Sequence, residues 1–191
     1  MVNLVKGQKV ELTKSNPGLT KINAGLGWDV NAFDSGMAFD LDAEVFLLGD
    51  NGKVTSDSDF VFYGNMTHPS GAVEHTGDNR DGAGDGDDET IKIDLSRVPE
   101  SVTRISFVAT IYDAETRNQN FGQVRNAFIR IYNPDTNEEL IRYDLTEDYS
   151  IETALIIAEL YRHNGEWKFN AVGAGYQGGL EAICRGYGVN V

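Results

Sequence analysis

The acidic stretch between residues 78 and 89 is the part of this sequence whose residue types point most directly to chemistry. It contains six carboxylates, one arginine and three glycines, and no other nearby base neutralises the acids. Crowded like charges repel one another, whereas a divalent cation among them turns repulsion into coordination. Calcium takes about six to eight oxygen ligands in flexible geometry, and glycines let the backbone fold closely around an ion. The stretch therefore predicts a calcium-binding loop with the ligands Asp78, Asn79, Asp81, Asp85, Asp87, Asp88 and Glu89.

Acidic residues outside this stretch extend the predicted site. Three acids alternate with apolar residues between positions 40 and 44, so a strand would place them in a row on one face, about 7 Å apart. Asp57 and Asp59 are expected to share a face of the neighbouring strand, beside that row. The acid that follows Gly27 and Trp28 is expected to reach the same edge. We therefore expect one or two metal sites built from several loops, with the further ligands Asp29, Asp40, Asp42 and Asp59.

Other interpretations of these acids remain open at this stage. A solvated acidic loop without a metal is the plain alternative, and magnesium is a second one. The spacing is not that of an EF-hand, because a loop beginning at Asp78 has Arg80 at its third position. Zinc is disfavoured because the donors are oxygens, the three histidines do not cluster and Cys184 is the single cysteine. We expect the histidines at turns or on the surface, and Cys184 in the core.

Composition and charge limit the class of protein. The chain has 191 residues, with 30 acidic against 16 basic side chains and a formal net charge of −14. A surface of that sign repels nucleic-acid phosphates and anionic lipid headgroups, so no nucleic-acid partner is expected. One cysteine allows no intramolecular disulfide, and the sequence contains neither a secretory signal nor an apolar run of membrane-spanning length. We expect a single domain over residues 1–191, located in the cytoplasm.

Alternation of polar and apolar residues predicts an all-β fold. Asn51-Gly52, residues 133–137 and Asn164-Gly165 carry turn chemistry, so the runs that flank them should form hairpins. About nine or ten short strands without a βαβ rhythm indicate an antiparallel β-sandwich, with a long acidic calcium-binding loop and a short helix at residues 177–186 near the C-terminus. The expected strands are 8–12, 37–48, 59–63, 90–95, 104–112, 125–132, 139–145, 152–162 and 166–172.

Several blocks of the sequence together resemble the TerD family of tellurite-resistance and general stress proteins. They are residues 25–29 (GLGWD), 39–43 (FDLDA), 56–63 (SDSDFVFY), 78–89, 120–127 (NFGQVRNA) and 161–169 (YRHNGEWKF). The resemblance implies a β-sandwich with two calcium sites and a role in resistance to tellurite and chemical stress. It also implies association with other tellurite-resistance proteins, including a membrane-embedded one, through which the chain would lie peripherally at the inner membrane.

Three functional classes compete for these features. We expect a non-enzymatic calcium-binding protein; the alternative is a metal-dependent hydrolase in which the paired carboxylates Asp40 and Asp42 do acid–base work. The sequence contains neither a Gly-x-Ser-x-Gly nucleophile motif nor a phosphate-binding Gly-x-x-x-x-Gly-Lys loop. Within the calcium class, the ion either only stabilises the fold or also changes the surface charge enough to permit docking on an acidic partner.

Overall fold

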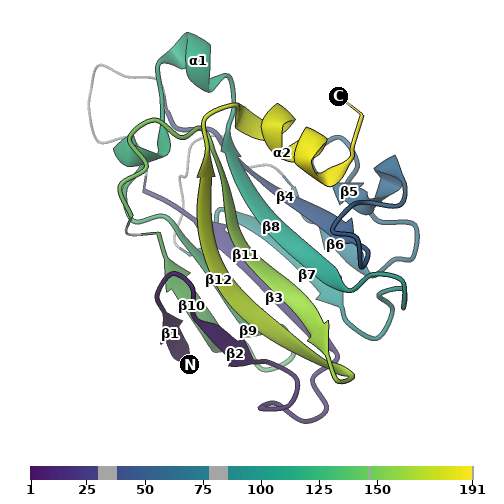
Figure 1. Ribbon diagram of the computed structural model, residues 1–191. Coiled ribbons are helices and arrows are strands. Elements are labelled where there is room, and N and C mark those ends of the chain that lie inside the picture. Colours follow the sequence, from purple (N-terminus) through teal and green to yellow (C-terminus); the bar gives the residue numbers. More distant parts are fainter. Residues whose placement is uncertain (30–37, 78–85, 146, 191) are drawn as a thin grey trace.

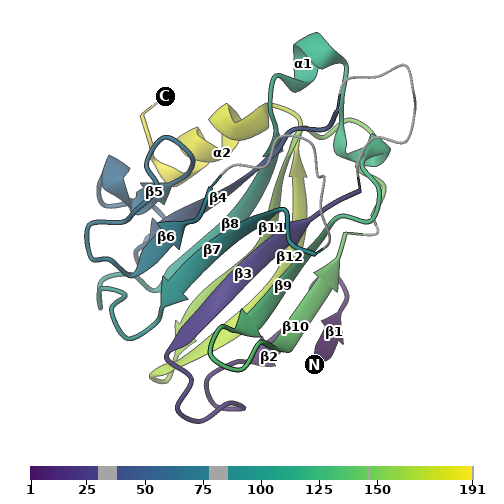
Figure 2. The same cartoon turned by 180° about the vertical axis from the view of Figure 1, so that it is seen from behind.

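Two sheets packed face to face make up the molecule. The computed structural model describes residues 1–29, 38–77, 86–145 and 147–190. Within these ranges the chain has twelve strands, divided equally between the two sheets (Figures 1 and 2). The predicted all-β sandwich is confirmed.

The first sheet contains the strands that carry most of the candidate site. Its strand order is β1 (Val2–Leu4), β10 (Glu138–Asp144), β9 (Phe128–Asn133), β3 (Lys21–Gly27), β7 (Glu89–Asp94) and β6 (Val73–His75). Neighbouring strands are antiparallel except β1 and β10, which run parallel. The parallel pair departs from the purely antiparallel prediction, because β1 is too short for its alternation to show in the sequence.

The second sheet is built around two long hairpin strands. Its order is β2 (Lys9–Glu11), β12 (Glu166–Tyr176), β11 (Ala154–His163), β8 (Arg104–Ile111), β4 (Leu41–Leu48) and β5 (Phe60–Val61). The predicted hairpins are confirmed for β4–β5, β9–β10 and β11–β12, each of which pairs antiparallel. Strand β5 pairs only with Val45 and Phe46, so the first residues of β4 lie at the open edge of this sheet.

The helical elements are short. They are the 3₁₀ turns η1 (Asp57–Asp59) and η2 (Phe121–Gln123) and the helices α1 (Ala114–Arg117) and α2 (Gly179–Tyr187). The predicted C-terminal helix is confirmed as α2, which lies across the outer face of the second sheet (Figure 1). It ends where Gly188 takes a left-handed conformation with φ of 85°, and the Lys53 ammonium donates to the carbonyl of Gly186. Among the described residues, no helix is long and apolar enough to cross a membrane.

Three strands and one turn differ from the sequence-based expectation. Strands β1, β3 and β6 were not predicted: β1 and β6 are only three residues long, and β3 contains two glycines, which have low strand propensity. The expected strand beginning at Asp59 starts one residue later. Asp59 is instead the last residue of η1, because Ser56 and Asp59 make a reciprocal capping box there.

Strand β4 is buried on both faces, whereas the sequence predicted a half-buried strand. Its inner side chains, Leu41, Ala43, Val45 and Leu47, lie in the core between the sheets. On the outer face, α2 forms a second apolar cluster with the sheet, made up of Phe46, Leu48, Phe60, Val108, Ala154, Ile156, Ile183, Cys184 and Val189. The acids at alternate positions of β4 therefore sit beside a covered apolar surface rather than in open solvent.

Packing of α2 on the sheet makes a direct prediction about stability. Ile183 is 2% exposed in the outer cluster, so Ile183→Ala should lower the free energy of unfolding by about 2–4 kcal/mol through lost burial and a residual cavity. Ile151 is 56% exposed, so the same substitution there is the matched control and should change little. Urea unfolding followed by circular dichroism measures both. Equal urea midpoints for Ile183→Ala and Ile151→Ala would show that the packing of α2 on the sheet does not stabilise the folded protein.

Candidate functional site

Acids from three strands meet at one edge of the sandwich, which we call the acidic edge. Its members lie where β3 ends, where β4 begins and where β7 begins. The backbone amide of Trp28 donates to Asp88 Oδ2 at 2.9 Å, and the indole of Trp28 donates to the carbonyl of Phe39 at 3.3 Å. Trp28 thus ties the three segments together. The acidic edge comprises Asp29, Asp40, Asp42, Glu44, Asp87, Asp88 and Glu89.

Glu89 connects the two sheets. Its side chain is 1% exposed, and its Oε2 accepts the backbone amide of Ala43 at 2.6 Å. That amide belongs to the open edge of β4, which β5 does not reach, and a buried amide without an acceptor is unfavourable. A carboxylate from the first sheet therefore takes the place of the missing neighbouring strand in the second.

Glu44 is a buried carboxyl group with incomplete hydrogen bonding. It is 1% exposed, and its Oε1 accepts the Thr110 hydroxyl at 2.6 Å, while Oε2 makes no hydrogen bond to any described residue. Burial raises the pKa of Glu44 well above its usual range, and the charges of Asp42 and Glu89 raise it further, against the opposing effect of Thr110. Glu44 is therefore a buried acid beside two other acids, with one oxygen that no described residue satisfies.

Cys184 lies under α2, as expected for a core residue. It is fully buried, and burial together with the charge of Glu44 raises the pKa of its thiol to about 11. A thiol with so high a pKa is a poor nucleophile near neutral pH.

Two of the predicted ligands are held by arginines, which corrects the expectation that no base neutralises the acids. Arg130 donates to both oxygens of Asp87, at 2.7 and 3.0 Å, and it also contacts Glu139 at 3.2 Å. Asp40 lies 3.6 Å from the guanidinium of Arg117. Both arginines come from parts of the chain far from the acids in sequence, so the pairing depends on the register of the strands.

A glycine in β3 makes room for the Asp87–Arg130 pair. A Cβ atom at Gly25 would lie 2.1 Å from Cγ of Asp87, and one at Gly27 would lie 2.5 Å from the ring of Phe128. Glycine inside a strand often marks such a close approach. The Gly-x-Gly of β3 was therefore the sequence signal for this contact, although nothing in the sequence identified the partners.

The remaining acids of the edge differ in exposure. Asp29 is exposed, and its Oδ2 accepts the side-chain amide of Asn126 at 2.6 Å. Asp88 is partly buried, and Asp42 is 7% exposed beside Glu44. Asp29, Asp42, Asp88 and Glu89 are thus predicted ligands that the structure brings to one edge.

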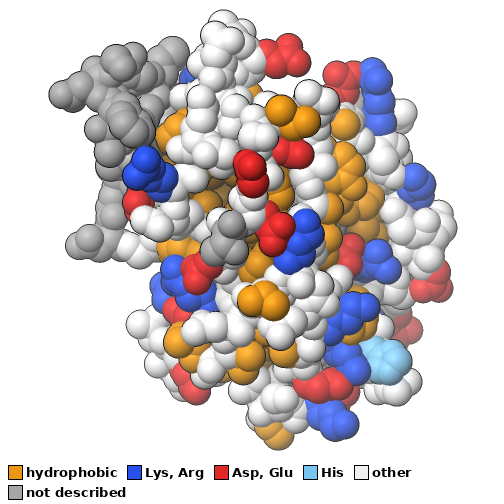
Figure 3. All heavy atoms as spheres, turned by 60° about the vertical axis from the view of Figure 1, so that its left-hand side comes forward, with side chains coloured by type: hydrophobic (Ala, Val, Ile, Leu, Met, Phe, Trp, Pro, Cys, Tyr) orange, Lys and Arg blue, Asp and Glu red, His pale blue; other side chains and the backbone are white. Residues whose placement is uncertain are grey.

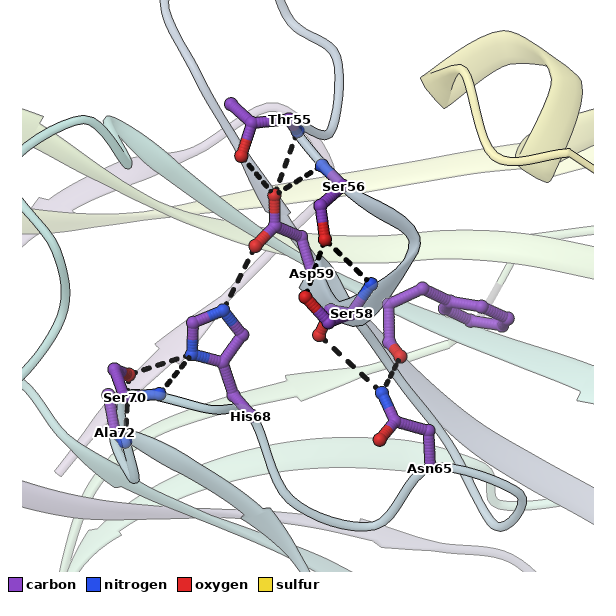
Figure 4. Close-up of polar contacts among 9 residues, drawn as sticks. Thr55, Ser56, Ser58, Asp59, Asn65, His68, Ser70 and Ala72 are labelled. Atoms are coloured by element: carbon purple, nitrogen blue, oxygen red, sulfur yellow. Dashed lines mark hydrogen bonds and ion pairs between the residues drawn. The ribbon is translucent and has the colours of Figure 1, made fainter.

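Asp59 lies elsewhere, which corrects its expected place beside Asp40 and Asp42. Its Oδ2 accepts the amide and hydroxyl of Thr55 and the amide of Ser56, at 2.8, 2.6 and 3.1 Å, and its Oδ1 faces His68 Nε2 at 3.0 Å (Figure 4). The network joins η1 to the loop before β6. Asp59 is therefore a local structural acceptor, at the far end of β4 from the acidic edge.

Two histidines are buried, whereas the sequence placed all three at turns or on the surface. His68 is 5% exposed against Asp59, and His75 is 1% exposed with its Nε2 3.5 Å from Glu89 Oε2. Each carries a carboxylate partner, which offsets the loss of solvent. His163, at the β11–β12 turn, is exposed as expected.

Part of the predicted site lies outside the described residues. Asp78, Asn79, Asp81 and Asp85 belong to this part. Within the described ranges, no group of three or more His, Cys, Asp or Glu side chains is arranged to hold a metal ion. Any complete cage would need donors beyond these ranges or water.

Away from the acidic edge, charges of opposite sign are mixed. On the side shown in Figure 3, acidic and basic side chains lie next to one another over the surface. Ion pairs in the described ranges include Lys168–Glu11 at 2.7 Å and Arg142–Asp144 at 2.8 Å. Neighbouring bases therefore offset part of the negative charge elsewhere on the surface.

Comparison with known proteins gives a consistent result. A family model described as the TerD domain matches residues 1–187. General stress protein 16U of Bacillus subtilis (strain 168) is 62% identical over 100% of this chain and 98% of its own length. Tellurium resistance protein TerD of Serratia marcescens is 58% identical over 99% of this chain and 98% of its own. A crystal structure of a protein of unknown function, SAV2460, superposes with a TM-score of 0.72 at 26% identity, covering 91% of this chain and 99% of that one.

The Asp59 network predicts a pH-dependent contribution to stability. Burial alone would raise the pKa of Asp59, but hydrogen bonds from Thr55, His68 and Ser56 outweigh it and lower the pKa below 3.8. Its stabilisation is therefore fully present above the unfolded-state pKa of about 4 and is lost as the pH falls through the lower folded-state value. Asp59→Asn should lower the free energy of unfolding by about 1–3 kcal/mol at pH 7, because an amide cannot accept at both ends.

Urea unfolding at several pH values measures this effect. Asp57 is a nearby exposed residue, so Asp57→Asn is the matched control. The difference between wild type and Asp59→Asn should shrink below about pH 4. A difference that is the same at pH 7 and pH 3 would contradict the assignment of an ionised Asp59.

Proposed function

The chain belongs to the TerD family, and from this premise we propose that it is a calcium-binding stress protein that contributes to tellurium resistance. The names of its relatives support the resistance and stress role. Calcium binding is the physical activity that we assign to the acidic edge.

One observation carries the calcium proposal, namely the buried Oε2 of Glu44, which no described residue satisfies and which lies beside two further acids. Glu44 is buried, and its Oε2 has no hydrogen bond to a described residue. The charges of Asp42 and Glu89 help to raise its pKa, so the ionised form of Glu44 is unfavourable. A divalent cation close to Asp42 and Glu89 would reverse the sign of the local field and stabilise the ionised carboxylates. The charge distribution thus favours a cation at this edge.

The donor chemistry favours calcium over other metals. Asp29, Asp42, Asp88 and Glu89 offer oxygen only, which suits a hard cation, and neither Cys184 nor His75 belongs to a zinc-type ligand group in the described ranges. Calcium accepts irregular sets of carboxylate, carbonyl and water oxygens, whereas magnesium needs near-octahedral geometry. The sequence supplies further oxygen donors at Asp78, Asn79, Asp81 and Asp85, directly before Asp87.

Bound calcium would add a further link between three segments that Trp28 and Glu89 already connect. The end of β3, the start of β4 and the start of β7 each contribute an acid to the edge, so one ion could hold all three in place. It would also reduce the negative charge of this surface. We propose that the loaded form docks on other tellurium-resistance proteins, and that a membrane-embedded partner brings the chain to the inner membrane.

The structure weakens the hydrolase alternative. Its carboxylate pair was Asp40 and Asp42, and Asp40 faces the guanidinium of Arg117 at 3.6 Å. An aspartate opposite an arginine is held as an anion and is a weak base. We therefore propose that the protein acts by binding and not by catalysis.

Calcium should stabilise the folded protein by mass action. At about a hundredfold excess over the dissociation constant, the gain is about 2.7 kcal/mol, which for a chain of this size raises the melting temperature by roughly 5–10 °C. The double variant Asp88→Asn, Glu89→Gln should lose most of this rise, whereas Asp135→Asn, at an exposed turn, should keep it. Thermal unfolding in chelator, in calcium and in magnesium measures the effect, and an unchanged melting temperature of the wild type in millimolar calcium would contradict calcium binding.

Resistance should depend on the same acids. In a bacterial strain that carries a tellurium-resistance operon without its own TerD-family gene, wild type and Asp135→Asn should restore growth on tellurite. The Asp88→Asn, Glu89→Gln variant should fail at equal protein level, because it lacks the calcium-loaded surface. Full restoration by this variant would separate resistance from calcium binding.

A further inference from the structure

The mouth of the β6–β7 hairpin contains a buried histidine that the proposed function does not yet use. His75 is the last residue of β6 and Glu89 the first of β7, and each is 1% exposed. His75 pairs in register with Ile91, two residues along from Glu89, so both side chains point to the inner face of the first sheet. The pair therefore closes the two ends of the acidic stretch from inside the sandwich.

Hydrogen bonding defines which nitrogen of His75 carries the proton. The backbone amide of Gly77 donates to Nδ1 at 3.2 Å, so Nδ1 is the acceptor nitrogen of a neutral ring. The proton then lies on Nε2, which faces Oε2 of Glu89 at 3.5 Å. At this distance the interaction is mainly electrostatic, and it directs the positive end of the N–H bond at the carboxylate.

Oε2 of Glu89 is engaged from two sides. It accepts the Ala43 amide at 2.6 Å and faces His75, so the two donors together set the orientation of the carboxylate group. Carboxylates that ligate metals are commonly oriented by such outer contacts, and loss of an outer contact typically weakens metal binding about 10–100-fold.

We propose that His75 is a positioning residue for calcium: through Nε2–H it helps to orient the carboxylate of Glu89 for the ion. This inference rests on the proposed calcium function and concerns how the site is pre-organised. His75 does not touch the ion itself. It acts through Glu89, while its Nδ1 fixes the ring by binding the amide of Gly77 at the beginning of the acidic stretch.

Two polar substitutions of His75 distinguish the role of Nδ1 from that of Nε2. In His75→Asn, the side-chain oxygen can replace Nδ1 as acceptor for Gly77, but no group reaches Glu89. In His75→Gln, the longer side chain can replace Nε2–H as donor to Glu89, while the Gly77 contact is lost. A purely structural role would make both variants similar, whereas positioning of Glu89 predicts that only His75→Gln keeps strong binding.

Terbium(III), an oxygen-seeking ion of similar size to calcium, gives a direct measurement. Trp28 donates its backbone amide to Asp88, so its indole lies near the proposed ion and should sensitise terbium emission. Calcium competition gives the affinity, and emission lifetimes in H₂O and D₂O count the waters on the ion. We expect His75→Asn to bind about 10–100-fold more weakly than wild type and to gain a bound water, as Glu89→Gln should.

Each outcome decides a separate point. His163→Leu, at an exposed turn, is the control and should match wild type. If wild type binds neither terbium nor calcium, the proposed function fails. If wild type binds but His75→Asn keeps its affinity and hydration, or His75→Gln loses as much as His75→Asn, the positioning role is overturned while calcium binding stands.

Discussion

The structure depends on one electrostatic constraint, which is the concentration of carboxylates where the two sheets meet. Strand β5 does not reach the beginning of β4, which pairs there with β8 on its other side, and Glu89 of the opposite sheet supplies the acceptor that the Ala43 amide needs. That contact brings a buried carboxylate close to Asp42 and Glu44. The same contact that gives the Ala43 amide an acceptor therefore concentrates negative charge, and the proposed calcium ion would offset that charge.

The arginines around the site divide the acids into two groups. Arg130 holds Asp87 over the glycines of β3, and Arg117 faces Asp40, so these two acids fix the position of the chain. Asp29, Asp42, Asp88 and Glu89 lie on the same edge and are the acids that we propose as ligands of the cation. Asp87 and Asp88 are adjacent in sequence yet have different partners, because Asp87 lies against Arg130 and Asp88 against the Trp28 amide. Asp87 thus anchors the chain to Arg130, while the adjacent Asp88 is a proposed ligand of calcium.

Local patterns in the sequence were sufficient for the sandwich, its main hairpins and the C-terminal helix. Alternation predicted β4, and the Asn-Gly turns at residues 51–52 and 164–165 predicted where the chain reverses after β4 and β11. The row of acids on one face of a strand, together with the acidic stretch and Asp29, predicted that Asp29, Asp42 and Asp88 lie near one another; that they bind a metal stays a prediction. The sequence could not place Asp59, because its capping box with Ser56 replaced the expected strand. Nor could it pair Asp87 with Arg130 or bury His75 against Glu89, since both contacts depend on strand register and on sheet order.

Membership of the TerD family gives these contacts a functional setting, and the sandwich is shared with a solved structure at only 26% identity. The most direct test of the account is a crystal structure grown with calcium or terbium, with anomalous scattering used to locate the ion. The account predicts a peak at the acidic edge, about 2.3–2.6 Å from carboxylate oxygens of Asp88 or Glu89. A saturated crystal with no peak at this edge, or with its ion bound only elsewhere on the molecule, would contradict it.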